Sequence, residues 1–343
     1  MELRENIQSV LSSYGLDVER LTISRIDSGH INYTYRVEPN WILQRININI
    51  FRNPDVLAAN LQVASNYLKQ YAPSYLFLTA IKNSTGLEMV YDQDGYPWRL
   101  FPFISNTATI DEVENSSQAF EASRAFGQLT KLLNGCDVNL FQETIPKFHN
   151  QSLRYLQFEQ ALKTTDSKRK EISKGLCTEY MRFNYLVKEF ESLTNSNQLK
   201  LRVTHNDTKI NNVLFDSDLK KVICVIDLDT LMPGYFIYDL GDMMRTFVSP
   251  AAEDETDLSK VVVRKEIYQA ILDGYLSEME DILTIEEKKA IPLAGLIMTY
   301  MIGLRFLIDY LNGDTYYQIS YPLHNLDRAA NQFCLLEKFV ELK

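Results

Sequence analysis

The chain has 343 residues, of which 45% are hydrophobic and 23% charged, a balance that excludes an intrinsically disordered protein. This length is enough for two lobes, each with its own core. A formal net charge of −10 argues against nucleic acid as a partner, because neutralising a phosphate backbone needs a broad basic surface. A small anionic ligand held by a few local cations is still compatible with this charge.

Two further classes of protein are disfavoured by the cysteines and by the longest apolar stretch. The four cysteines lie far apart and form no CxxC pair, so we expect neither a zinc site nor a disulfide framework. The N-terminal residues lack the apolar segment of a signal peptide. The apolar stretch 291–311 is interrupted by Arg305 and Asp309, which predicts a buried core helix. We therefore expect a cytoplasmic protein without a membrane partner.

The first hundred residues have a mixed pattern of helices and strands. Alternating apolar residues predict strands, and Pro54 marks the start of a helix. The turn signals Pro-Asn near residue 40 and Asp-Gly near residue 95 predict hairpins. The expected helices are 3–14 and 55–71, and the expected strands are 20–27, 33–37, 41–46, 75–81, 87–91 and 96–103.

After residue 105 helical patterns dominate. The expected helices are 116–133, 150–163, 167–193, 258–281, 285–311 and 323–340, with a small island of strands at 201–203, 213–215 and 222–226. The fold class is therefore α+β, with a small N-terminal lobe (1–102), a short connector, and a larger, mainly helical lobe (103–343). A cleft between two lobes is a usual place for a ligand.

The strand island contains an unusual group of polar residues. His205, Asp207, Lys209 and Asn212 lie within eight residues, and Asp227 ends an apolar run shortly afterwards. A polar loop between strands is usually only a loop. A carboxylate at the end of a buried strand, however, is costly unless a cation or a metal pairs with it. Two such features close together favour a functional site.

The group matches the needs of phosphoryl transfer, where positioning and charge neutralisation are the main tasks. Asp207 can accept the proton of an attacking hydroxyl, and Lys209 can meet the charge that develops on the moving phosphoryl group. Asn212 and Asp227 offer the oxygen ligands that Mg²⁺ prefers. His205 is better suited to bracing the loop than to chemistry.

Several phrases resemble a known family. The run His205-Asn-Asp207-Thr-Lys-Ile-Asn-Asn212 fits the H-x-D-x-x-x-x-N loop of kinase-like phosphotransferases. Ile226-Asp227, followed by Tyr-Asp-Leu-Gly-Asp, is similar to the aminoglycoside phosphotransferase and choline kinase superfamily, and protein-kinase D-F-G is absent. SGHINYTYRV (28–37), WILQRIN (41–47) and GDTYYQISYPLHNLDRAANQ (313–332) resemble, within it, the N-acetylhexosamine 1-kinase group. The resemblance spans almost the whole chain and implies a protein-kinase-like two-lobe fold.

The resemblance implies a nucleotide site in the first lobe. Ser28 and Gly29 would lie in the loop that covers the phosphates, although that loop holds one glycine only. The lysine that the superfamily carries on its next strand is missing, so Arg45 or Gln44 would contact the phosphates, or the role is vacant and Arg45 is only an exposed strand cation. The glutamate that usually partners this lysine is also missing from the helix 55–71.

Other residues are assigned by the same resemblance. Phe101 and Phe103 would lie in the connector that holds adenine, or be plain core residues. His30 and Asp229 would contact a sugar substrate.

Arg305 and Tyr316 complete the implied sugar site. Arg305 lies in an otherwise apolar helix, where a charge needs a partner. Asp309 follows at i+4 and would be the structural partner, whereas a cleft-facing Arg305 would be functional. Tyr316 could equally be a packing aromatic.

The resemblance implies an enzyme that uses ATP and Mg²⁺ to phosphorylate the anomeric hydroxyl of an N-acetylhexosamine. Three alternatives stay open. The acceptor could be an aminoglycoside, choline or homoserine. The missing lysine and glutamate could indicate a nucleotide-binding pseudokinase. A metal hydrolase is the weakest alternative, because the four histidines are too dispersed for a His-rich site.

Overall fold

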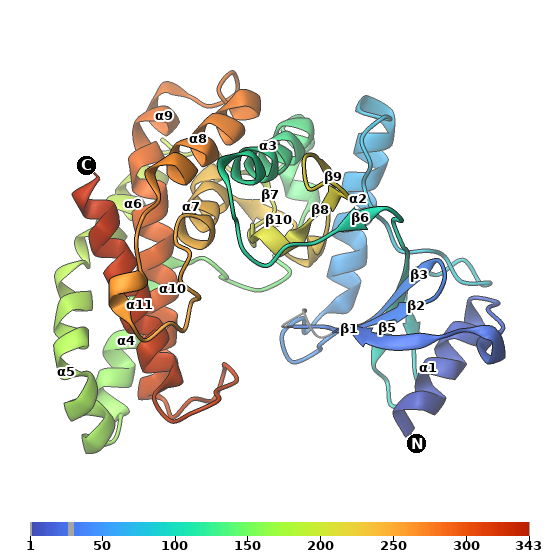
Figure 1. Ribbon diagram of the computed structural model, residues 1–343, viewed down its shortest axis with the longest axis horizontal. Helices are drawn as coiled ribbons and strands as arrows, with labels where there is room; N and C mark the ends of the chain where they lie inside the picture. Colours follow the sequence, from blue (N-terminus) through green and yellow to red (C-terminus); the bar gives the residue numbers. More distant parts are fainter. Residues whose placement is uncertain (1, 27–30, 343) are drawn as a thin grey trace.

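The computed structural model describes residues 2–26 and 31–342, which form a small lobe and a larger helical lobe (Figure 1). The small lobe is built on an antiparallel sheet of order β1-β2-β3-β5-β4. Its strands are β1 (Ile23–Ile26), β2 (Tyr33–Val37), β3 (Trp41–Arg45), β4 (Val90–Tyr91) and β5 (Pro97–Pro102). The fold is α+β, as the sequence predicts.

The two faces of this sheet have different partners because side chains alternate along each strand. One face packs against α1 (Glu2–Ser13) in a small apolar core that contains Leu11, Leu43 and Trp98. The opposite positions on β3 and β5, among them Gln44 and Arg99, face the larger lobe and line a cavity.

Helix α2 (Pro54–Tyr71) begins with proline at its first turn, where the missing N–H costs no helical hydrogen bond. It follows β3 in the chain, yet its buried Leu61 and Leu68 belong to the core of the larger lobe. The Asn60 amide donates to the carbonyls of Gln142 (2.8 Å) and Leu231 (2.9 Å), which ties this helix to the larger lobe.

The larger lobe is a layered set of helices around α10. Its helices are α3 (Ser116–Leu133), α4 (Gln151–Thr164), α5 (Ser167–Arg182), α6 (Tyr185–Asn195), α7 (Phe236–Phe247), α8 (Lys265–Met279), α9 (Ile285–Ala290), α10 (Ala294–Leu311) and α11 (His324–Glu341). Among the described residues, one helical stretch, Ile285–Leu311, is long and apolar enough to cross a membrane. Since 78% of its apolar window is buried inside the protein, it packs as a core helix, as expected.

The strand island forms two small sheets next to α3 and α7. In the first, β7 (Arg202–Thr204) pairs with β10 (Met232–Gly234), a strand that the sequence did not suggest. In the second, β8 (Val213–Asp216) lies between β6 (Thr107–Ala108) and β9 (Val222–Val225). These sheets bring the loop after β7 and the turn after β9 side by side.

Several local predictions were wrong, among them the helix 258–281, since α8 begins only at Lys265. Residues 75–81 form no strand, because the bond from Ile81 N to Leu100 O (2.7 Å) is the one backbone hydrogen bond that joins this segment to β5 among the described residues. The expected helix 167–193 breaks into α5 and α6. No helix was predicted over α7, whose Asp239 and Asp242 are buried beside the loop after β7.

Candidate active site

The loop after β7 is held by His205, which is fully buried. Its Nε2 donates to the carbonyl of Ile226 (3.0 Å), and its Nδ1 accepts the backbone N–H of Asp207 (3.3 Å). The ring also packs edge-on against Phe126. His205 thus joins the loop to the residue before Asp227, which confirms the bracing role that the sequence predicts.

Two carboxylates on α7 hold the backbone of the same loop. Asp239 accepts the N–H groups of His205 (3.0 Å) and Asn206 (2.7 Å), and Asp242 accepts that of Thr208 (3.0 Å). Burial raises the pKa of Asp239 to about 6, although these hydrogen bonds oppose the rise. The loop is therefore fixed from both sides, so its free side chains have a defined direction.

Asp207 and Lys209 form the charged centre of the loop. The Lys209 ammonium lies 3.4 Å from Asp207 Oδ1, and the Asn212 amide donates to the Asp207 carbonyl (2.8 Å) and to Oδ2 (3.3 Å). Burial acts to raise the pKa of the Asp207 carboxyl, but Lys209, with His205 and Arg245, outweighs burial and lowers it. Asp207 is therefore ionised at neutral pH and can accept a hydrogen bond from an alcohol.

Asp227 follows β9 in a left-handed backbone conformation, with φ of 54°. Among the described residues its carboxylate has no hydrogen-bond donor and no cation within ion-pair distance, although its side chain reaches solvent in the cavity. Partial loss of hydration in the cleft, together with the negative charges of Asp229 and Asp207, raises the pKa of Asp227 to about 7. A divalent cation would relieve this crowding of carboxylates.

The residues present fit a Mg²⁺ ion. Because the Asn212 NH₂ group points at Asp207, its amide oxygen is free to face a cation beside Asp227. Within residues 2–26 and 31–342, no group of three or more His, Cys, Asp or Glu side chains could hold a metal ion by itself. Mg²⁺ suits such a site, since it usually takes one or two protein oxygens and completes its shell with phosphates and water.

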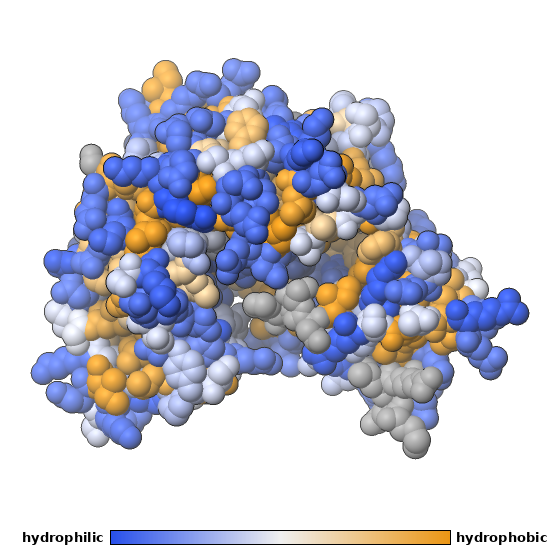
Figure 2. Space-filling model, in the orientation of Figure 1, coloured by the Kyte–Doolittle hydropathy of each residue, from blue (hydrophilic) through white to orange (hydrophobic). Residues whose placement is uncertain are grey.

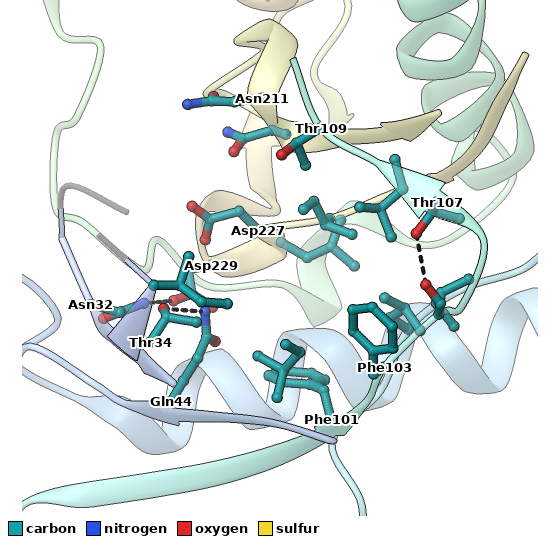
Figure 3. Close-up of a pocket in the computed structure, with 18 of the residues that line it drawn as sticks. Asn32, Thr34, Gln44, Phe101, Phe103, Thr107, Thr109, Asn211, Asp227 and Asp229 are labelled. Atoms are coloured by element: carbon teal, nitrogen blue, oxygen red, sulfur yellow. Dashed lines mark hydrogen bonds between the residues drawn. The ribbon is translucent and has the colours of Figure 1, made fainter. Parts of the chain in front are cut away.

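These side chains open into one cavity of about 340 Å³ between the lobes. Figure 2 shows the surface hollowed there, and Figure 3 shows Asp227 and Asn211 of the second lobe opposite Thr34 and Gln44 of the first. Eight of the predicted site residues line it, namely Gln44, Phe101, Phe103, Asp207, Lys209, Asn212, Asp227 and Asp229.

The connector forms an apolar end of the cavity. Phe101 and Phe103 lie there beside Thr107 (Figure 3), and aliphatic side chains such as Ile104 and Leu214 also line the cavity. Phe103 is 36% exposed, and the Arg36 guanidinium covers its ring at 3.4 Å from the centroid. A flat, apolar slot of this kind suits a planar heteroaromatic base.

The first-lobe wall contains a polar group that the sequence reasoning missed. Arg99 on β5 donates to Gln44 Oε1 from Nε (3.2 Å) and Nη2 (2.9 Å), and its Nη2 lies 2.6 Å from Asp229 Oδ1. Asn32 donates to the other oxygen of Asp229 (2.7 Å). The sequence feature that could have identified Arg99 is its place as a single charged residue in the apolar strand Pro-Trp-Arg-Leu-Phe.

Of the two first-lobe candidates for the phosphates, Gln44 faces the cavity and Arg45 does not. The Arg45 guanidinium lies on the other side of β3, and its carbon Cζ is 4.2 Å from the ring centroid of Tyr33 and 4.7 Å from that of Tyr96. Neighbouring positions on a strand point to opposite faces, which accounts for the difference. The predicted Ser28, Gly29 and His30 lie outside the described residues.

Arg305 and Tyr316 lie together in the larger lobe and do not line this cavity. The Arg305 guanidinium is surrounded by the rings of Phe148 (5.1 Å), Tyr316 (5.9 Å) and Tyr317 (5.8 Å). Asp309 is not its partner, because that carboxylate accepts the backbone N–H groups of residues 315–317. In the described part of the chain no carboxylate pairs with Arg305, so the ion pair with Asp309 is wrong, and the cleft-facing role of Arg305 stays a prediction.

The two-lobe fold and the convergent Asp207, Asn212 and Asp227 define a protein of the kinase-like phosphotransferase class. A family model described as "Phosphotransferase enzyme family" (APH) matches residues 22–279. The chain belongs to this family.

Solved structures with the same fold extend over nearly the whole chain. An aminoglycoside phosphotransferase from Alicyclobacillus acidocaldarius is 14% identical, with a TM-score of 0.67, and the match covers 98% of this chain and 95% of that one. The amicoumacin kinase hAmiN, in complex with AMP-PNP and Ca²⁺, is 16% identical (TM-score 0.60; 99% and 97% covered). A choline/ethanolamine kinase family protein from Mesorhizobium loti is 13% identical (TM-score 0.56; 98% and 94% covered).

Proposed function

We propose that this protein is a small-molecule kinase that uses ATP and Mg²⁺ to phosphorylate the anomeric hydroxyl of an N-acetylhexosamine. The observation that carries the kinase assignment is the convergence of Asp207, Asn212 and Asp227 in one cavity that ends in an apolar slot. Such a cavity suits a nucleotide whose base fills the slot and whose terminal phosphate lies at the polar end.

In the proposed reaction the acceptor hydroxyl lies against Asp207, which takes its proton as the oxygen forms a bond to the γ-phosphorus. The bond from that phosphorus to the β,γ-bridging oxygen breaks, and ADP leaves with the electron pair. Lys209, 3.4 Å from Asp207, keeps the carboxylate ionised and meets negative charge on the transferring group. An anomeric hydroxyl suits this weak base, because it is more acidic than an ordinary alcohol.

Asn212 and Asp227 would hold the Mg²⁺ ion. When bound, this ion neutralises charge on the phosphates. The raised pKa of Asp227 means that part of the metal-free protein carries this carboxyl protonated at neutral pH. Metal binding would therefore release a proton from Asp227.

The larger lobe supports a neutral sugar as the acceptor. Arg305 is surrounded by aromatic rings and is not neutralised by a carboxylate among the described residues. Its charge disfavours cationic acceptors such as aminoglycosides or choline, whereas sugar hydroxyls can accept from a guanidinium. Tyr316, 53% exposed, offers a ring face against which a sugar can pack.

A coupled ADP-release assay tests the proposal with purified protein, ATP and Mg²⁺. The acceptor panel contains N-acetylhexosamines, free hexoses, choline, ethanolamine, homoserine and aminoglycosides. We expect the highest kcat/KM with an N-acetylhexosamine, and a sugar 1-phosphate as the product by ³¹P NMR.

Two outcomes would contradict the proposal at different levels. Turnover of an amine with no turnover of sugars would remove the hexosamine assignment and leave a kinase. No acceptor-stimulated ADP release with any compound, in a protein that binds MgATP, would favour the pseudokinase alternative. The Asp207→Asn variant is the matched control for contaminating activity.

A further inference from the structure

The walls of the cavity carry an uneven set of charges. Among the described residues that line it are three carboxylates, Asp207, Asp227 and Asp229, and two cations, Arg99 and Lys209. Lys209 is already paired with Asp207 in the second lobe. A polyphosphate that enters this cavity adds several negative charges, so the first-lobe wall needs a cation of its own. Within the described residues that line the cavity, Arg99 is the first-lobe cation.

Arg99 is placed and oriented by the sheet. It is the direct cross-strand partner of Gln44, which lies two residues after Ile42 on the cavity face of β3. Both Nε and Nη2 of Arg99 donate to the Gln44 side-chain oxygen, which fixes the plane of the guanidinium. The Arg99 side chain is 4% exposed, so its charge acts in a poorly solvated place, where electrostatic interactions are strong.

Part of the guanidinium is still available. Nη2 lies 2.6 Å from Asp229, but Nη1 has no hydrogen-bond partner in residues 2–26 and 31–342 and is not among the fully buried unpaired atoms. Arginine can donate up to five hydrogen bonds, so it can keep Gln44 and Asp229 while it contacts a phosphate.

We propose that Arg99 is the first-lobe residue that contacts the phosphates of the bound nucleotide, with Gln44 as the positioning residue that orients it. The cation thus comes from β5 and not from the neighbouring strand β3. The two β3 residues that line the cavity, Ile42 and Gln44, carry no charge. This inference rests on the proposed nucleotide binding, and it replaces Arg45, which lies on the far face of β3.

The competing explanation is that Arg99 serves only to neutralise the buried Asp229. The two explanations predict different nucleotide affinities for a variant that loses both charges. Arg99→Met/Asp229→Asn removes a buried ion pair as a unit, which proteins often tolerate, whereas removing one partner leaves an uncompensated charge. If neutralising Asp229 were the only role, this double variant would bind nucleotide normally.

Isothermal titration calorimetry with MgADP and with adenosine separates the phosphate contribution from the base contribution. For Arg99→Met/Asp229→Asn we expect MgADP to bind about ten- to a hundredfold more weakly, as for a lost charged hydrogen bond, and adenosine to bind within about twofold of wild type. Asp229→Asn alone should bind MgADP at least as well as wild type, since it removes a nearby negative charge. Circular dichroism melts confirm that each variant is folded.

Three results would overturn the inference. They are wild-type MgADP affinity in the double variant, an equal loss for MgADP and adenosine, and a loss in Asp229→Asn as large as in the double variant. A loss in Arg45→Met with none in the double variant would move the assignment back to β3. If the wild-type protein bound neither MgADP nor adenosine, the proposed nucleotide site itself would fail, which is a different outcome from a normal double variant.

Discussion

The two walls of the interlobe cavity are built from contacts of very different range. On the second-lobe wall, α7 carboxylates hold the catalytic loop through bonds that span 33 and 34 residues, all within one lobe. On the first-lobe wall, Gln44 and Arg99 are 55 residues apart, and Asn32 reaches Asp229 across 197 residues. The second-lobe wall therefore keeps its shape by itself, whereas the first-lobe wall depends on how the two lobes meet.

This difference separates two kinds of failure. A change in the second-lobe wall should remove chemistry or folding and leave the first lobe intact. A change in a residue at the contact between the lobes, or in a residue that contacts a substrate, should alter the affinity for nucleotide or acceptor and leave the fold intact. The variants below test this division.

The largest effect is expected for Asp207→Asn. An amide cannot take the proton of the substrate hydroxyl. The kcat should therefore fall by about a hundredfold to ten-thousandfold, the usual contribution of a general base. The asparagine preserves the size of the side chain and can still accept from Asn212, so MgADP affinity and thermal stability should stay near wild type. Coupled kinetics and calorimetry on one preparation check this. Turnover within about threefold of wild type would remove Asp207 from the mechanism.

Asp239→Ala should destabilise the fold strongly. It leaves the buried N–H groups of His205 and Asn206 without acceptors, at a cost of roughly 2–5 kcal/mol in the free energy of unfolding. Urea denaturation at pH 7 measures this cost.

Asp273→Ala on α8 is the control for Asp239→Ala, because it removes an exposed carboxylate that bonds only to Gln269 among the described residues. It should change stability by less than about 0.5 kcal/mol. Equal losses in the two variants would mean that the α7 carboxylate does not support the loop.

Arg305→Met is expected to act on acceptor binding alone. The guanidinium lies among aromatic rings and pairs with no carboxylate in the described structure, so its removal breaks no ion pair and the fold should persist. The KM for the acceptor should rise about tenfold or more, as for one lost charged hydrogen bond, with the KM for ATP unchanged. Arg182→Met, on the exposed surface of α5, is the charge-matched control. A fall in thermal stability without a change in KM would assign Arg305 a structural role.

The sequence predicts the second-lobe wall well for the same reason that this wall is self-contained. Asp207, Lys209 and Asn212 lie within one short motif, and Asp227 ends the next apolar strand, so both features can be found locally in the sequence. The first-lobe wall could not be read in this way. Whether Gln44 or Arg45 faces the cavity depends on which face of β3 packs against α1, and the role of Arg99 depends on its register with Gln44. Helix α7 was missed because its two carboxylates are partners of a distant loop.

The smallest effect concerns Asp227, because its side chain is exposed and solvent screens its charge, and this effect depends on pH. The pKa of this carboxyl rises from its ordinary value of 3.8 to about 7 in the folded protein. Below about pH 4 it is protonated in both the folded and the unfolded states, so it adds no penalty. Between about pH 4 and 7 the folded state retains a proton that the unfolded state has lost, and stability therefore falls as the pH rises. Above about pH 7 the full penalty applies.

Asp227→Asn should consequently be more stable than metal-free wild type at pH 8, and the difference should disappear towards pH 4. Asp239, whose pKa is also raised, titrates in both proteins and cancels in the comparison. Urea unfolding in EDTA across this range measures the difference, and excess Mg²⁺ should reduce it, because the ion neutralises the carboxylate that carries the penalty. A variant less stable than wild type at pH 8 without metal would mean that Asp227 makes a stabilising contact in the folded protein. If Asp227→Asn lost activity and gained stability, Asp227 would be a carboxylate that serves metal binding at a cost to the stability of the fold. It would then differ from the α7 carboxylates of the second-lobe wall, which support the fold.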